Sequence, residues 1–253
     1  MITVKTYPTP SKKYQETVCV AGIDQDGNWI RIYPIRFRYL EDDKQFTKYS
    51  IVKALVRKNE KDFRSDSFKI DSDSIQILSK MGTDHSWQAR NSIVLPTVAS
   101  SIETIKERYE STSHSLGIFK PKEIFDFIVE VDKESARVKQ NEFIKQLTLF
   151  DPQAPKNLKP LPYKFSYRFN CNHPNCKGHK YIILDWEIYA AFFAWEKKYG
   201  LENAINMIQK KWMDEMFAPS RDTYLIVGTT FPNPTFTVLG VYWPPVNLQY
   251  SLF

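Results

Sequence analysis

The chain has 253 residues, with 35 Lys and Arg against 29 Asp and Glu and a formal net charge of +6. Hydrophobic residues make up 42% and aromatic residues 15%, which is too apolar for a disordered chain. The length allows two compact domains or one large one. A basic balance favours anionic partners, nucleic acid first, although a basic protein can also lack such a partner.

The 3 cysteines are too few for a disulfide framework. Cys19 stands in the apolar run TVCVAGI and is expected to be a small buried residue. The other two stand beside histidines, which in a reducing compartment suggests metal binding. The sequence shows neither an apolar signal segment nor a run of ~20 apolar residues. We therefore expect a cytoplasmic protein with no membrane partner.

The first part of the chain has the pattern of a β-meander. Apolar runs fill residues 14–60, and Asp26-Gly27 between two of them predicts a hairpin. Further strands are expected at 50–58 and 68–81. The range 14–95 suits a small five-stranded barrel such as the OB-fold.

A helix and a second β-rich unit follow. Ser100 and Glu103 have the spacing of a capping box, which predicts a helix over 100–110. Residues 116–132 have strand character, and 138–150 could be helix or strand. We expect 116–150 to form a second OB-like barrel.

Four prolines in residues 151–162 predict a stiff linker, so we place the domains at 1–150 and 151–253. The second domain is expected to be α+β. A strand pattern from Tyr163 leads to helices over 185–200 and 201–216, separated by Gly200. Strands over 223–230 and 235–243 end the chain. The predicted fold class is mainly β plus α+β.

Cysteine and histidine cluster at Cys171, His173, Cys176 and His179, in the pattern C-x-H-x2-C-x2-H. Zinc takes four N or S ligands in a tetrahedron, at ~2.0–2.3 Å. The sequence predicts a structural zinc hairpin here, because four protein ligands leave no open position for water. Three of these residues with a ligand from elsewhere is an alternative, and so is a polar hairpin tip with incidental thiols.

The strand before the cluster alternates aromatic and polar residues. Tyr163, Phe165, Tyr167 and Phe169 share one face, and Lys164, Ser166, Arg168 and Asn170 share the other. Aromatic rings beside cations suit single-stranded nucleic acid, because bases stack on the rings. The alternative is that the aromatic residues face the core and the basic residues face water.

Asp185 and Glu187 follow the apolar strand end YIIL. A pair of carboxylates at a strand end can hold a hard metal in a nuclease, with His179 as the base. The alternative is helix capping by Asp185, with Glu187 in the first turn facing the helix dipole. We favour capping.

A basic and aromatic patch lies in the first unit. Arginines and a lysine would contact phosphates, and aromatic residues would stack on bases. With two residues from the later strand, the candidate nucleic-acid-binding residues are Arg31, Tyr33, Arg36, Phe37, Arg38, Lys53, Tyr167 and Arg168. The alternative is a strand and loop that carry solvated arginines.

Residues 16–38, with E-T-x-C-x-A-G-I and W-I-R-I-Y-P, and residues 48–67 resemble the dual OB-containing domain of bacterial conflict systems. Residues 62–67, DFRSDS, resemble the family's D-x-R-x-E-S with Asp in place of Glu, and 116–130 resembles its second barrel entry. The resemblance implies two adjacent OB barrels, a nucleic-acid-sensing role in phage defence, and other defence proteins as partners.

We therefore predict a nucleic-acid-binding protein, with single strands favoured, that carries a structural zinc ion. The alternatives are a metal-dependent nuclease using His179, Asp185 and Glu187, and a protein-interaction adaptor in a defence complex.

Overall fold

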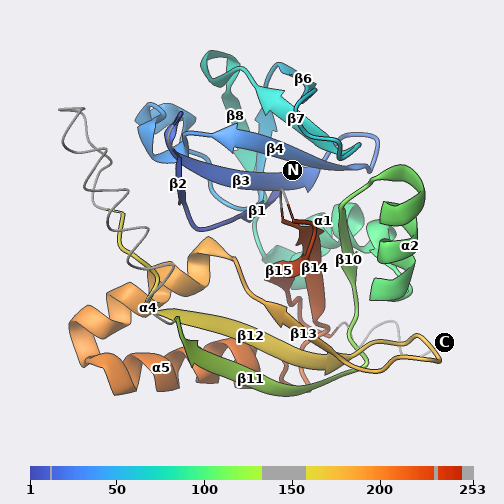
Figure 1. Ribbon diagram of the computed structural model, residues 1–253, viewed down its shortest axis with the longest axis vertical. Helices are drawn as coiled ribbons and strands as arrows, with labels where there is room; N and C mark the ends of the chain where they lie inside the picture. Colours follow the sequence, from blue (N-terminus) through green and yellow to red (C-terminus); the bar gives the residue numbers. More distant parts are fainter. Residues whose placement is uncertain (12, 133–157, 231–232, 247–253) are drawn as a thin grey trace.

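The computed structural model describes residues 1–11, 13–132, 158–230 and 233–246 (Figure 1). The expected boundary at 150/151, the segment 138–150 and most of the proline-rich linker lie outside the described residues. Within the described residues, strands predominate and helices are fewer, as the sequence predicts. Among these residues, no helix combines the length and the apolar character needed to cross a membrane.

An N-terminal sheet has the strand order β1-β3-β4-β7-β6, with β2 paired to β3. Its strands are β1 (Ile2–Lys5), β2 (Thr9–Ser11), β3 (Gln15–Ile23), β4 (Trp29–Ile35), β6 (Val56–Lys58) and β7 (Ser67–Ile70). The expected hairpin at Asp26-Gly27 is confirmed, because β3 and β4 are antiparallel and Gly27 has φ +82. The remaining strands of this half, β5 (Ser50–Lys53) and β8 (Gln76–Lys80), form a separate antiparallel pair.

The described strands close no barrel in this half, because β4 pairs with β7 in parallel and β5-β8 stands apart. Short 3-10 turns lie between these elements: η1 (Phe37–Tyr39), η2 (Asp42–Lys44), η3 (Ser72–Ser74) and η4 (Leu95–Thr97). The sequence pattern did not predict helix α1 (Asp84–Val94), which begins with His85, Ser86 and Trp87 in left-handed backbone conformations.

A central sheet follows, in the order β15-β14-β10-β9. It consists of β9 (Val98–Ala99), β10 (Leu116–Phe119), β14 (Tyr224–Thr229) and β15 (Phe236–Tyr242), and the helix α2 (Ile102–Thr112) lies between its first two strands in the chain. Both C-terminal strands were expected. The segment expected as one strand over 116–132 is divided, because β10 and β11 belong to different sheets.

The third sheet has the order β11-β12-β13, with β11 (Glu123–Val131), β12 (Tyr163–Asn170) and β13 (His179–Ile182). β11 comes before the expected boundary and β12 after it, yet the two pair along their length. Helices α4 (Trp186–Tyr199) and α5 (Leu201–Gln209), with the π turn η5 (Lys210–Glu215), lie against this sheet (Figure 1). Asp185 caps α4 as expected, and Gly200 separates the helices.

The central sheet lies between the other two (Figure 1). One of its faces supplies Leu225 and Val227 to a large core with α2, α4, α5 and the β12 aromatics. The other supplies Leu116 and Ile226 to a core shared with the N-terminal sheet. The aromatic side chains of β12 face the first core, so burial, not base stacking, explains their alternation.

Candidate metal centre

The hairpin between β12 and β13 brings the cysteines and His179 to one place. Phe169 pairs with His179 at the hairpin end, and Cys171 follows β12 directly. The connecting residues turn tightly, since Cys176 N donates to His173 O at 3.1 Å and Gly178 has φ +85. The loop therefore folds back over the strand ends and returns Cys176 to the neighbourhood of Cys171.

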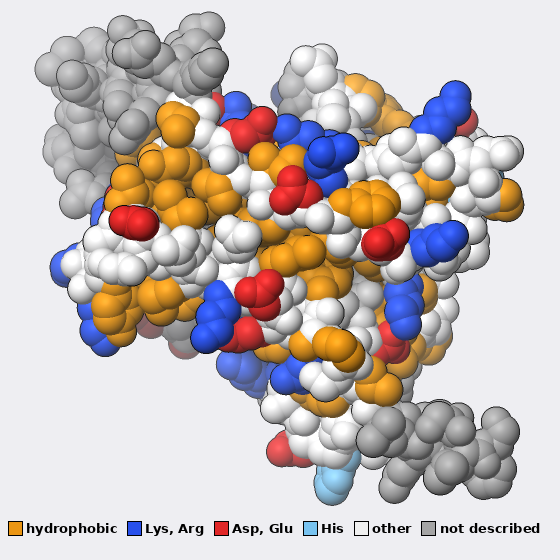
Figure 2. Space-filling model, turned by 90° about the horizontal axis from the view of Figure 1, so that it is seen from below, with side chains coloured by type: hydrophobic (Ala, Val, Ile, Leu, Met, Phe, Trp, Pro, Cys, Tyr) orange, Lys and Arg blue, Asp and Glu red, His pale blue; other side chains and the backbone are white. Residues whose placement is uncertain are grey.

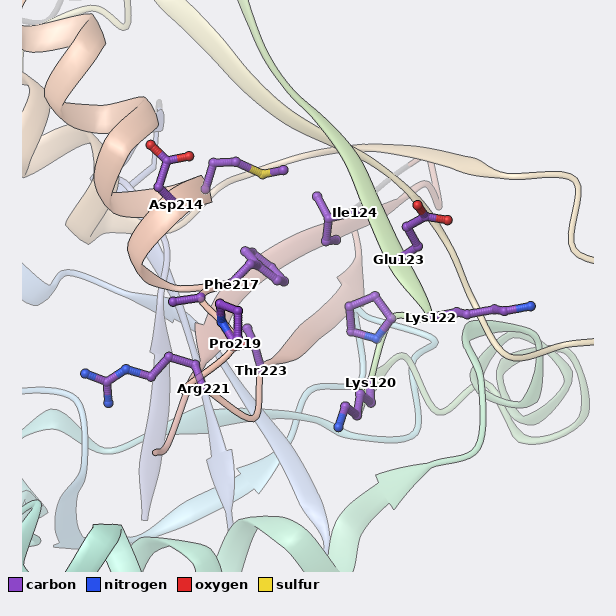
Figure 3. Close-up of a pocket in the computed structure, with 12 residues that line it drawn as sticks. Lys120, Lys122, Glu123, Ile124, Asp214, Phe217, Pro219, Arg221 and Thr223 are labelled. Carbon is purple, nitrogen blue, oxygen red and sulfur yellow. The ribbon is translucent and has the colours of Figure 1, made fainter. Parts of the chain in front are cut away.

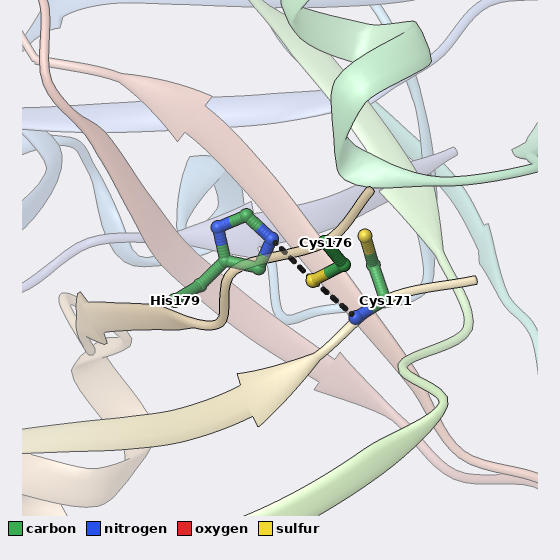
Figure 4. Close-up of side chains that lie close together, drawn as sticks. All are labelled: Cys171, Cys176 and His179. Atoms are coloured by element: carbon green, nitrogen blue, oxygen red, sulfur yellow. Dashed lines mark hydrogen bonds between the residues drawn. The ribbon is translucent and has the colours of Figure 1, made fainter. Parts of the chain in front are cut away.

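Three potential ligand atoms converge there (Figure 4): the sulfurs of Cys171 and Cys176 and a ring nitrogen of His179 all lie within 4.8 Å of one another. Cys176 Sγ lies 3.4 Å from His179 Nε2. Tetrahedral zinc bonds of ~2.0–2.3 Å separate the ligand atoms by roughly 3.3–3.8 Å. The spacing therefore suits a single metal ion held by two thiolates and an imidazole.

His173 does not join this group, which corrects the four-residue set expected from the sequence. Its Nδ1 accepts a hydrogen bond from Asn175 N at 3.3 Å, and its carbonyl accepts from Cys176 N. The ring thus belongs to the turn itself.

Glu103 approaches the cluster from α2, and sequence reasoning did not place it there. The Cys171 thiol donates to Glu103 Oε2 at 2.7 Å, and Glu103 Oε1 lies 3.2 Å from His179 Nε2. The sequence pattern around Glu103 is typical of a capping box, but the helix is capped by Ser101, whose Oγ accepts from Thr104 N at 3.2 Å. No local pattern could place a residue 68 positions away beside Cys171.

The surroundings change the acidity of these groups in different directions. Burial, together with the hydrogen bond to Glu103, raises the pKa of Cys171 to about 12. Desolvation acts in the same sense on Cys176, but hydrogen bonds from the backbone N–H groups of Cys171 and Gly178 outweigh it, so its pKa is lowered. Desolvation lowers the pKa of His179. A metal binds thiolate and neutral imidazole, so the pKa shifts at Cys176 and His179 act toward the metal-binding forms, whereas the shift at Cys171 acts against its thiolate.

Several residues of the expected nucleic-acid patch are buried. Arg31 is 2% exposed and donates to Cys19 Sγ and Ser115 Oγ, both at 3.0 Å. Phe37 is 5% exposed and packs edge-on against Phe46. These positions correct the expectation that Arg31 contacts phosphate and Phe37 stacks on a base, because neither side chain reaches the surface.

Arg38 forms an ion pair with the buried carboxylate of Glu16. Tyr33 is half-buried, and its hydroxyl lies 3.4 Å from that of Thr17. The exposed members of the predicted set are Arg36, Lys53 and Arg168.

Tyr167 is fully buried, and its hydroxyl donates to Trp212 O at 2.6 Å. This corrects its assignment as a residue that stacks on bases. At this position the aromatic side chain faces the core, which was the alternative interpretation of the alternating strand.

Asp185 and Glu187 face a lysine and not His179. Lys48 Nζ lies 2.6 Å from Asp185 Oδ2 and 3.1 Å from Glu187 Oε2, and Asp185 Oδ1 accepts from Glu187 N at 3.0 Å. Burial alone would lower the pKa of Lys48, but attraction to the two carboxylates outweighs it and the pKa is raised. The lysine ammonium thus occupies the position that a metal ion would need between the carboxylates. The three residues of the nuclease alternative are divided between two sites.

Residues 62–67 form a buried polar network. Asp62 accepts from Arg64 Nη2 at 2.6 Å and from Ser67 Oγ at 2.7 Å, and Arg64 Nη1 donates to Thr229 O at 2.8 Å. Asp66 accepts from the backbone N and the hydroxyl of Ser115, both at 2.9 Å. The D-x-R-x-D-S motif therefore connects the N-terminal sheet to the central sheet.

A pocket of about 540 Å³ lies elsewhere, between the start of β11 and the chain from the end of η5 to Thr223 (Figure 3). Its apolar lining includes Ile124, Met213 and Phe217, with Lys120 at its edge paired to Asp222 at 2.6 Å. It shares no lining residue with the metal centre.

Comparison with protein-family models divides the chain at residue 97. A model described as Domain of unknown function (DUF8758) matches residues 1–96, and one described as Domain of unknown function (DUF8757) matches residues 98–253. A search of curated proteins found no match. The second model begins just before α2 and contains Glu103, both cysteines of the cluster and His179. Because that model spans more than half of the sequence, the chain belongs to the family Domain of unknown function (DUF8757).

Proposed function

We propose that the protein binds one zinc ion through Cys171, Cys176 and His179. The observation that carries the proposal is the convergence of two sulfurs and one imidazole nitrogen within 4.8 Å at the end of one hairpin. Thiolate ligands combined with imidazole favour zinc over magnesium, calcium or manganese, which prefer oxygen ligands. The metal would stabilise the hairpin, in which residues 171–178 have little regular hydrogen bonding.

Thermal unfolding with and without a chelator tests this role. A metal ion that binds only the folded state stabilises it by about 4 kcal/mol when the free metal concentration is 1,000 times Kd. A strong chelator should therefore lower the Tm of wild type and of the control His173→Gln. Cys176→Ser should start at the lower Tm and not respond. Chelator-independent melting of the wild type would contradict the proposal.

A second candidate function is nucleic-acid binding, with single strands favoured. It is supported by the net charge of +6 and by the exposed cations Arg36 and Lys53 on the N-terminal half. Figure 2 shows basic and acidic side chains interspersed on the face seen from below, so that face presents no surface of a single charge to phosphates. The defence-system role implied by the resemblance stays a prediction.

Salt-dependent binding to single-stranded and duplex DNA and RNA tests the second candidate. Arg36→Ala with Lys53→Ala should flatten the salt dependence by about one unit of slope per lost phosphate contact. Lys197→Ala, an exposed change on α4, serves as the control. If wild type binds none of these nucleic acids at low salt, this candidate is wrong and the zinc proposal is unaffected.

A further inference from the structure

Three protein ligands fill only three of the four coordination positions of a tetrahedral zinc ion. The Glu103 carboxylate lies beside two of the three ligands, with Oε2 at 2.7 Å from Cys171 Sγ and Oε1 at 3.2 Å from His179 Nε2. On the basis of the proposed zinc site, we infer that Glu103 is the fourth zinc ligand. The ligand set is then two thiolates, one imidazole and one carboxylate, with three ligands from the hairpin and one from α2.

The distances favour a ligand over a general base. Ligand atoms on one tetrahedral zinc ion lie roughly 3.3–3.8 Å apart, or slightly closer for two short bonds. A general base for zinc-bound water lies a further hydrogen bond of ~2.6–3.2 Å beyond that water. Glu103 Oε2 is closer to Cys171 Sγ than this ligand-to-ligand separation, and Glu103 Oε1 is about that far from His179 Nε2. The Glu103 carboxylate therefore lies within reach of a metal ion bound by Cys171 and His179.

The charges also suit this assignment. The Cys171 thiol donates a hydrogen bond to Glu103, and zinc would replace the thiol proton between the same two side chains. Two thiolates and a carboxylate exceed the charge of Zn²⁺ by one negative charge. Lys106, 3.6 Å from Glu103 Oε1 on the next turn of α2, supplies a compensating positive charge. The coordination sphere would thus be complete and nearly neutral in a place where the His179 side chain is only 8% exposed.

The consequence is a cross-link between distant parts of the fold. Glu103 and Cys171 are 68 residues apart, and Ile102 and Ile105 of α2 share a core with Phe169 of β12. A metal bond at this place closes a long loop, which constrains the unfolded chain more than a bond within the hairpin would. The zinc ion would therefore fix α2, and not the hairpin alone.

Cobalt substitution of the full-length protein tests the inference. Wild type and the control Glu107→Ala, an exposed change on the same helix, should bind Co²⁺ with the intense visible bands of a tetrahedral site. Glu103→Ala and Glu103→Gln should keep the thiolate-to-cobalt band, change the visible bands as water enters, and lose more than ~100-fold in zinc affinity, since loss of an outer-shell partner alone costs ~10–100-fold. Glu103→His, which restores a ligand, should recover affinity that Glu103→Gln does not.

Two results would overturn the inference, and they differ. If wild type and Glu107→Ala take up neither Co²⁺ nor Zn²⁺, the zinc proposal fails and the inference fails with it. If wild type binds metal but Glu103→Gln keeps the same spectrum and affinity, the zinc site stands and Glu103 is not a ligand.

Discussion

Lys48 places its ammonium group between Asp185 and Glu187, and its side chain is only 6% exposed. Asp185, with a side chain 3% exposed, depends on this cation, since a buried carboxylate without a partner is costly. The D-x-E sequence pattern alone suits either a metal site or a helix cap. What decides between them is a lysine 137 positions away, which no local pattern reveals.

We expect Lys48→Met to lower the free energy of unfolding by about 3–5 kcal/mol, because it leaves the Asp185 carboxylate buried and unpaired. Lys53→Met, at an exposed position of β5, should change it by less than about 0.5 kcal/mol. Urea unfolding of both variants measures this. Wild-type stability in Lys48→Met would show that the ion pair has no structural role.

At the scale of elements, the periodic patterns predicted best. The β3-β4 hairpin, helix α4 with its Asp185 cap, and strands β14 and β15 follow from alternation, capping and turn residues. Helix α1 was missed because its first turn has left-handed residues, which no helix signal includes. The pairing of β11 with β12 was missed because sheet partners are chosen by tertiary packing and not by the strand sequence.

The alternating strand β12 offers a test within one element. Tyr167→Phe removes a buried hydrogen bond to Trp212 O and should cost about 0.5–1.5 kcal/mol, whereas Tyr167→Ala should cost about 3–5 kcal/mol through the cavity. Arg168→Ala, on the exposed face, should stay within about 0.5 kcal/mol of wild type. Equal stability of Tyr167→Ala and Arg168→Ala in denaturant unfolding would be inconsistent with the buried aromatic face.

At the scale of the whole molecule, the two family regions share one core. Val4, Ala21 and Trp29 of the first region pack with Leu116 and Ile226 of the second. A sequence can show which residues are apolar, but not that two regions bury them against each other. For the same reason, the N-terminal strands could be predicted individually but their arrangement could not, and the described strands close no barrel.

The polar network across this boundary should make the two regions unfold together. Arg64→Met leaves Asp62 buried without its cation and removes the bond to Thr229 O, so we expect a loss of about 3–5 kcal/mol in a single transition. Arg57→Met, on an exposed strand position, is the control. Two separate transitions in wild-type calorimetry would contradict a shared core.

Elemental analysis of the purified full-length protein decides whether Cys171, Cys176 and His179 hold a zinc ion. We predict about one zinc per chain in wild type and in His173→Gln, whose ring lies in the turn outside the cluster. We predict almost none in Cys176→Ser. Zinc-free wild type after expression and purification with zinc present, or equal zinc in wild type and Cys176→Ser, would contradict the assignment.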